Sequence, residues 1–118
     1  MKAIASNITL NENGVVELSN KVVEISTYKD YYKHLECSTF DVARVEWLGE
    51  EISLYIDDEG LFKEGNLGRE VKGYPQPLFG NIVICGGVDN KGNTLEVPDC
   101  ITLENINDFI KEVTHIAR

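Results

Sequence analysis

The chain has 118 residues, a length that predicts one domain covering residues 1–118. Hydrophobic residues make up 42% and charged residues 26%, which is typical of globular proteins and excludes a disordered chain. The 11 basic and 20 acidic residues give a net charge of −9. Because such a protein repels phosphate backbones and anionic lipid, we expect neither direct nucleic-acid binding nor membrane binding.

The number and spacing of the three cysteines predict the redox state of the compartment in which the protein works. Cys37, Cys85 and Cys100 are odd in number and lack the spacing of zinc ligands, so they predict reduced thiols and no metal site. Reduced thiols are typical of the cytosol, and we expect a cytoplasmic location. The N-terminal apolar stretch is too short for a signal peptide, and no run reaches the roughly 20 apolar residues of a membrane span.

The N-terminal third predicts a hairpin followed by a helix. The turn NENG joins residues 3–10 to the segment VVEL, and the sequence leaves open whether VVEIS continues that strand or begins another. Residues 27–37 predict a short amphipathic helix, because Thr27 and Asp30 have capping-box spacing and apolar residues recur every three or four positions.

The middle of the chain predicts further antiparallel strands. The segment FDVARVEW alternates apolar and polar residues and ends in Trp47, which is expected in the core, and the turn LGEE leads into ISLYI. The apolar run NIVIC, bounded by Gly80 and Gly86, predicts a central strand buried on both faces. Cys85 within it is expected to be a small buried side chain, not a nucleophile.

The C-terminal segment predicts the second helix, over residues 102–117. Thr102 can cap it, and Leu103, Ile106 and Ile110 begin an apolar stripe. With strands before each helix and no long βαβ alternation, the chain is expected to be an α+β domain. Its architecture is expected to be a small, mainly antiparallel sheet packed by two helices, at about residues 27–37 and 102–117.

The segment IDDEGLFKEGNLGREV, residues 56–71, could be a metal-binding loop, a phosphate-binding loop or a simple turn. Its acids and glycines lack the spacing of a calcium loop or of a phosphate-binding loop. We therefore interpret Asp57, Asp58 and Glu59 as a solvated turn in which Gly60 relieves backbone strain. The sequence also shows no nucleophile with a base and an orienting acid, so we expect no catalytic residues, no cofactor and no enzyme activity.

An uncharged loop follows, GYPQPLFG at residues 73–80, with two prolines and two aromatic residues. On an acidic protein it is the best candidate for a contact surface, although lining the core is an equally good interpretation. We take Arg69, Lys72, Tyr74 and Phe79 as candidate contacts with a ligand or partner.

Residues 52–86 also resemble a known family. An apolar strand ending in DDEG, a connection containing Gly and Arg, and an aromatic-Gly pair entering an apolar strand (LFGNIVICG) are similar to the domain-of-unknown-function 3846 family. Its members are small proteins often encoded by phages, plasmids and other mobile elements. The resemblance implies no catalytic residues and an accessory role.

Two functions remain open from these observations. The first is a non-enzymatic accessory protein of a phage or mobile element that binds a host or element-encoded protein, for example as an anti-defence inhibitor. The alternative is a small-molecule or nucleotide-signal binding protein that uses residues 69–79. A protein partner is expected in the first case, and a homo-oligomer is compatible with either.

Overall fold

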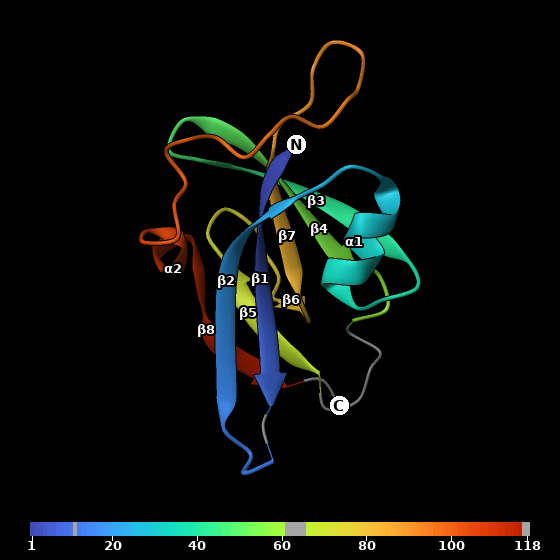
Figure 1. Cartoon of the computed structure of the whole chain (residues 1–118). Coiled ribbons are helices and arrows are strands. Elements are labelled where there is room, and N and C mark those ends of the chain that lie inside the picture. Colours follow the sequence, from blue (N-terminus) through green and yellow to red (C-terminus); the bar gives the residue numbers. More distant parts are fainter. Residues whose placement is uncertain (11, 61–65, 117–118) are drawn as a thin grey trace.

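The computed structural model describes residues 1–10, 12–60 and 66–116, with the backbone alone for residues 10 and 112–116. It contains two antiparallel sheets and two short helices (Figure 1). The elements in chain order are β1 (Lys2–Leu10), β2 (Val16–Glu24), α1 (Tyr28–Leu35), β3 (Phe40–Trp47), β4 (Glu50–Asp57), β5 (Leu67–Val71), β6 (Leu78–Phe79), β7 (Ile82–Gly86), α2 (Ile106–Phe109) and β8 (Ile110–Ile116).

The larger sheet has the strand order β2-β1-β7-β4-β3. Its central strand is β7, the segment predicted from NIVIC, and every residue of β7 is buried. The sequence left open whether VVEIS continues the strand that begins at VVEL. β2 is one uninterrupted strand that pairs with β1 from Lys2 opposite Glu24 to Leu10 opposite Val16, with no shift in register.

The smaller sheet, β6-β5-β8, corrects the prediction for the C-terminus. Only Ile106–Phe109 of the predicted helix 102–117 is helical, Ile110–Ile116 is a strand paired with β5, and residue 117 lies outside the described part. The segment IKEVTHI is rich in β-branched residues, which favour strands, and pairing satisfies the backbone groups along β5. The domain is therefore mainly antiparallel sheet with two short helices, not one sheet under two helices.

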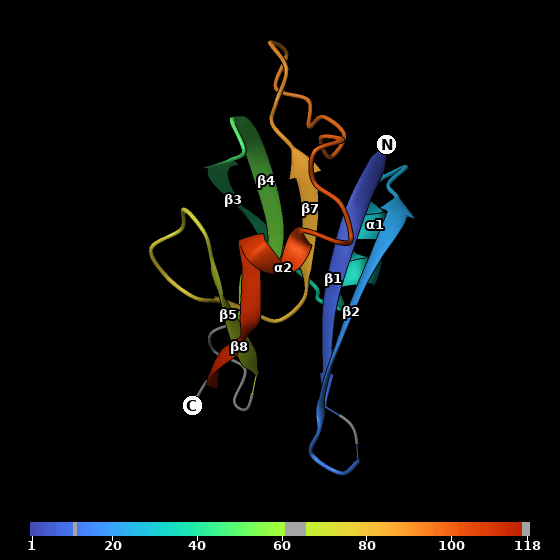
Figure 2. The ribbon, with the colours of Figure 1, turned by 90° about the vertical axis from the view of Figure 1, so that its left-hand side faces the viewer.

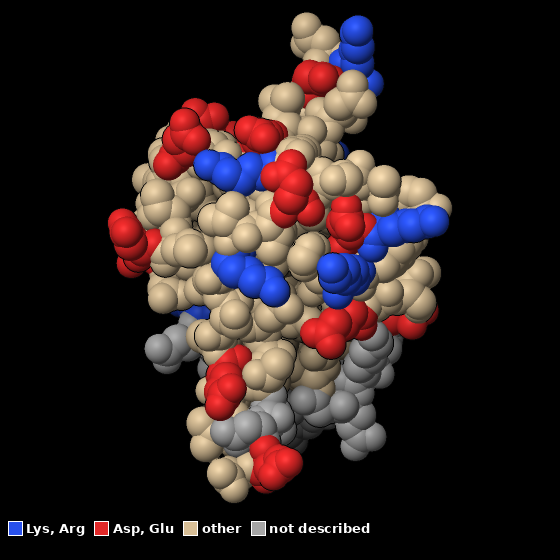
Figure 3. Space-filling view, in the orientation of Figure 1, with Lys and Arg blue, Asp and Glu red and all other residues tan. Residues whose placement is uncertain are grey.

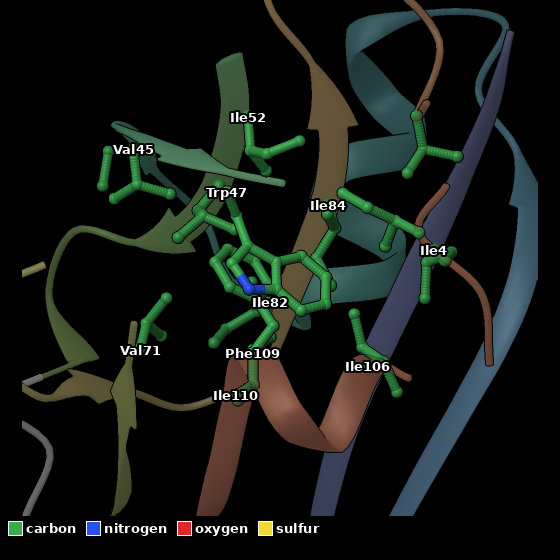
Figure 4. Close-up of a cluster of buried hydrophobic side chains, with 14 of the residues drawn as sticks. Ile4, Val45, Trp47, Ile52, Val71, Ile82, Ile84, Ile106, Phe109 and Ile110 are labelled. Atoms are coloured by element: carbon green, nitrogen blue, oxygen red, sulfur yellow. The ribbon is translucent and has the colours of Figure 1, made fainter. Parts of the chain in front are cut away.

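The main hydrophobic core lies between the two sheets (Figure 4). Ile4, Ile52 and Ile84 from the larger sheet meet Val71 of the smaller one. The ring of Trp47 stacks on Phe109 of α2, with 4.6 Å between ring centroids and 14° between ring planes. Trp47 is thus in the core, as predicted from its place at the end of an alternating strand.

A second core covers the opposite face of the larger sheet, where α1 lies (Figure 1). Tyr31 of α1 stacks on Tyr55 of β4 with ring centroids 4.0 Å apart, and it lies beside Cys85 of β7. The predicted helix start is confirmed, since Thr27 and Asp30 form a capping box. Cys85 is fully buried, as predicted, and this burial raises the pKa of its thiol to about 11.

None of the helices in the described part of the chain is both long enough and apolar enough to cross a membrane.

Candidate functional site

Arg69, a predicted contact residue, lies in the interior. Its side chain is 2% exposed and extends from β5 across to β1. The Nη1 atom donates to Ser6 Oγ at 2.6 Å, and Nη2 donates to the backbone oxygens of Ser6 at 2.9 Å and Gly80 at 3.4 Å. Ser6 Oγ in turn donates to Oδ1 of Asn20 on β2. The guanidinium therefore ties the smaller sheet to the larger one, and a ligand at the surface does not reach it.

The charge of Arg69 is held by neutral acceptors. The ion pairs of Met1 with Glu24 and of Lys2 with Asp99 do not involve Arg69. Its Nε atom has no hydrogen-bond partner in the described part of the chain. Burial lowers the pKa of the guanidinium to about 10, so the group keeps its proton at neutral pH.

Lys72, a second predicted contact, is exposed at the end of β5. Its backbone N–H donates to the carbonyl oxygen of Phe109 at 2.9 Å, which joins the end of β5 to α2. The side chain does not line the surface formed by the two predicted aromatic residues. The four predicted contact residues therefore do not form one surface. Arg69 is buried, Lys72 is exposed elsewhere, and Tyr74 and Phe79 lie together.

The aromatic pair does come together. Tyr74 and Phe79 line a hollow of about 150 Å³ at one end of the larger sheet, and both are partly exposed. The same hollow is lined by three acidic residues, Asp41, Asp57 and Asp58. We call this surface the acidic hollow; its remaining lining residues are Ile56, Gln76, Pro77 and Leu78.

Two glycines allow Phe79 to approach the backbone closely. A Cβ atom at Gly60 would lie 2.5 Å from the backbone oxygen of Phe79, and one at Gly68 would lie 2.6 Å from the Phe79 ring. Gly60 is not among the glycines with positive φ, so close approach explains it, and the interpretation as a relief of strain was wrong. Gly60 and Gly68 thus make room for the aromatic residue that lines the acidic hollow.

The carboxylates of the acidic hollow are positioned by the backbone around them. Asp57 ends β4 and is 8% exposed, so it is not the solvated residue that the sequence predicted, and its carboxylate accepts from the N–H of Glu59 at 3.0 Å. Asp58 is exposed and accepts a hydrogen bond from the hydroxyl of Thr39. Asp41 is exposed and accepts from the N–H of Val42 at 2.8 Å.

Sequence reasoning missed Asp41 as a member of this group. In the register of β3 with β4, Asp41 lies opposite Ile56 and Phe40 lies opposite Asp57. This pairing brings Asp41 beside acids that follow it by more than a dozen positions. The sequence shows an alternating strand and an acidic turn, but the register that joins them depends on the hairpin between them.

The acidic hollow has the chemistry of a cation site. Carboxylates form charge-assisted hydrogen bonds with guanidinium and ammonium groups, and the faces of Tyr and Phe rings attract the same cations. Ile56, Pro77 and Leu78 add apolar surface that suits the methylene stem of a lysine or arginine. The described residues contain no group of three His, Cys, Asp or Glu side chains arranged to hold a metal ion.

Comparison with known proteins gives one match. The family model described as "Domain of unknown function (DUF3846)" matches residues 9–113, which include every residue lining the acidic hollow. No curated protein and no solved structure matches the chain.

Proposed function

The chain belongs to the DUF3846 family, a domain of unknown function, and from that premise we propose that it is a non-enzymatic protein that binds another protein. As the resemblance implies, it would serve a phage or other mobile element, and its target would be a host or element-encoded protein. Inhibition of a host defence is one form that such binding takes. The proposal rests on the composition of one surface, the acidic hollow.

The observation that carries the proposal is the presence of three acidic residues beside Tyr74 and Phe79 in the lining of the acidic hollow. Aromatic and apolar walls provide contact area, while Asp41, Asp57 and Asp58 select for positive charge. A lysine or arginine on the partner can place its stem against Pro77 and its charged end among the carboxylates. With a net charge of −9, the whole protein also favours approach of a basic partner surface.

The alternative, a nucleotide-signal binding protein, fits this surface less well. It required Arg69 beside the aromatic residues to hold a phosphate, but Arg69 is buried against Ser6. Three acidic residues line the surface beside Tyr74 and Phe79 instead, and their negative charge repels phosphate. A protein that acts by imitating DNA would present a continuous row of carboxylates, whereas Figure 3 shows the acidic and basic side chains of the described residues interspersed on one face.

Affinity capture from a host lysate with paired variants tests the proposal. Asp41→Lys reverses a charge in the acidic hollow, and Glu104→Lys makes the same change at an exposed residue that does not line it. We expect a protein captured by the wild type to be lost with Asp41→Lys and retained with Glu104→Lys. Capture of the same proteins by all three, or of none above background, would contradict the proposal.

A small probe tests the chemistry of the surface directly. N-acetyl-arginine amide carries the cation and stem of an arginine side chain without a partner protein. We expect NMR titration with this probe to shift the amide signals of Asp58 and Phe79 in the wild type and in Glu104→Lys. The shifts should be weaker in Asp41→Lys. Adenosine monophosphate is the matched anionic probe, and shifts caused by it alone would favour the nucleotide alternative.

A further inference from the structure

The strand β2 is an exposed edge of the larger sheet. It pairs with β1 on one side, and no other strand of the described residues pairs with it. Natural sheets usually protect such edges with proline, bulges, short strands or charged side chains. β2 has charged side chains at Glu17, Lys21 and Glu24, but it is nine residues long, contains no proline and pairs in an unbroken register. Figure 2 shows the β1–β2 hairpin running along one side of the molecule and past the smaller sheet.

Apolar side chains are exposed along this strand. The exposed fractions are 37% for Val16, 38% for Leu18 and 52% for Val22. These residues are two and four positions apart, and side chains separated by an even number of positions lie on the same face of a strand. In the hairpin, Val22 lies opposite the buried Ile4, and Leu18 lies opposite Ile8. The apolar stripe that starts in the core therefore continues to the edge of the sheet and ends in solvent. Such a stripe beside a long edge strand without proline or a bulge is typical of a strand-pairing surface.

We propose that β2 pairs antiparallel with β2 of a second copy of this chain, about a two-fold axis at Ser19. In that register Lys21 lies opposite Glu17 of the second copy, and the symmetry repeats this pair. Val16 likewise lies opposite Val22 of the second copy, again twice. Two ion pairs and two valine pairs thus form from one strand, and the two larger sheets join into one continuous sheet.

The charges of β2 identify the occupant as a second copy. Glu17 and Lys21 are both exposed, on the same face, and equidistant from Ser19. A strand with this arrangement is complementary to itself in the antiparallel direction. Glu17 has an interaction within its own chain, but a carboxylate accepts several hydrogen bonds and can also meet a lysine.

This interface is separate from the acidic hollow. The hollow includes Asp41 of β3, and β3 is the opposite edge of the five-stranded sheet. Dimerisation through β2 therefore leaves both copies of the hollow open. The inference does not depend on the proposed function, and it predicts a particle that presents two hollows.

A charge-swap cycle on the full chain tests the register. Sedimentation velocity over a concentration series should show the wild type changing from monomer to dimer, with the weak affinity of a small interface. Glu17→Lys and Lys21→Glu each place like charges opposite one another twice, so each should raise the dissociation constant about tenfold or more. The double variant exchanges the two charges and should restore dimerisation.

The control is a charge reversal on the other edge. Arg44 is exposed on β3, so Arg44→Glu changes the net charge by the same amount as Lys21→Glu and should leave the dissociation constant unchanged. Urea unfolding of each variant checks that the hairpin still folds. A wild type that stays monomeric at about 500 μM, or a double variant no better than the single ones, would overturn the proposal.

Discussion

Arg69 shows how far a single residue can depart from its expected role. An arginine in a glycine-rich, charged segment was interpreted as a surface contact, whereas the structure uses it as a buried link between sheets. Its charge is stabilised by hydroxyl and carbonyl oxygens in place of a carboxylate. The sequence could not reveal this, because the burial depends on β5 lying across from β1, a contact between segments more than 60 positions apart.

Two substitutions of Arg69 should distinguish how much its packing and how much its charge contribute to the free energy of unfolding. Arg69→Ala leaves a cavity and two buried carbonyl oxygens without a donor, so we expect a loss of about 3 kcal/mol in the free energy of unfolding. Arg69→Met leaves the same two oxygens without a donor, but it keeps most of the volume and removes the buried charge, so its loss should be smaller, about 1 kcal/mol. Urea unfolding at neutral pH measures both, and equal losses would show that volume is unimportant there.

The pH dependence of the Arg69→Met difference gives a second readout. The folded pKa of Arg69 is about 10, below the ordinary value of an arginine, because burial disfavours the charged form. Between these values the unfolded chain binds more protons, so the wild type should gain stability relative to Arg69→Met as the pH rises above about 10. A constant difference between pH 8 and pH 11 would contradict the burial of the charge.

Gly60 and Gly68 allow a comparison between two close contacts of Phe79. Alanine at Gly60 would meet the Phe79 backbone oxygen, which cannot move without the chain, whereas alanine at Gly68 would meet the ring, which can turn. We expect Gly60→Ala to cost about 3 kcal/mol and Gly68→Ala about 1 kcal/mol. Thermal unfolding of the two variants measures the order, and the reverse order would show that the ring is the more rigid contact.

At the scale of elements, α1 was predictable and β8 was not. The signals for α1 are local: a capping box and apolar residues at helical spacing lie within residues 27–37. Residues 102–117 carry an apolar pattern that fits a helix, but they also carry β-branched residues that fit a strand. The unpaired edge of β5 decides between them, and that edge is formed by residues more than 30 positions earlier.

The start of α1 can be weakened without touching the core. Thr27→Ala removes the oxygen that accepts from the N–H of Lys29, so we expect a loss of about 1 kcal/mol in the free energy of unfolding. Thr27→Ser keeps the oxygen and serves as the control. Chemical denaturation followed by circular dichroism measures the change, and equal stability of Thr27→Ala and Thr27→Ser would show that the cap contributes nothing.

α2 is only four residues long, yet it supplies Phe109 to the main core. Phe109→Ala removes the ring stacked on Trp47 and should cost about 3 to 5 kcal/mol. Because Trp47 is the only tryptophan, its fluorescence reports the change directly. We expect the emission maximum of the folded variant to move to longer wavelength, whereas Leu103→Ala, a change at an exposed residue, should leave it unchanged.

At the scale of the whole molecule, repulsion among the excess acidic residues should lower the free energy of unfolding. The net charge is −9, and the ion pairs Met1–Glu24 and Lys2–Asp99 lie at the N-terminal end of β1. Salt screens repulsion among the remaining carboxylates, so the urea midpoint should rise between about 20 mM and about 500 mM sodium chloride. A midpoint that falls with salt would show that attractive pairs outweigh the repulsion.

The sequence predicted most of the larger sheet but not the pairing of two sheets. Alternation in FDVARVEW and the apolar run NIVIC each identify a strand and its buried faces from a few neighbouring residues. The second sheet consists of short strands of five, two and seven residues, whose patterns are too brief to identify. The acidic hollow was found only in part, since Tyr74 and Phe79 are marked by an uncharged loop and the carboxylates are joined to them by tertiary structure.

The contact of Phe79 with Gly60 and Gly68 has a consequence for how this family diverges. Gly68 meets the ring of Phe79, so the columns of these two residues should covary among homologues, and sequences with a small residue in the column of Phe79 should tolerate alanine or serine in that of Gly68. Gly60 meets the backbone oxygen of Phe79, which every residue at that position has, so its column should keep glycine in both cases. Sequences that keep the aromatic residue should keep both glycines. An alignment can therefore divide the family into members that retain an aromatic wall in the hollow and members that have lost it.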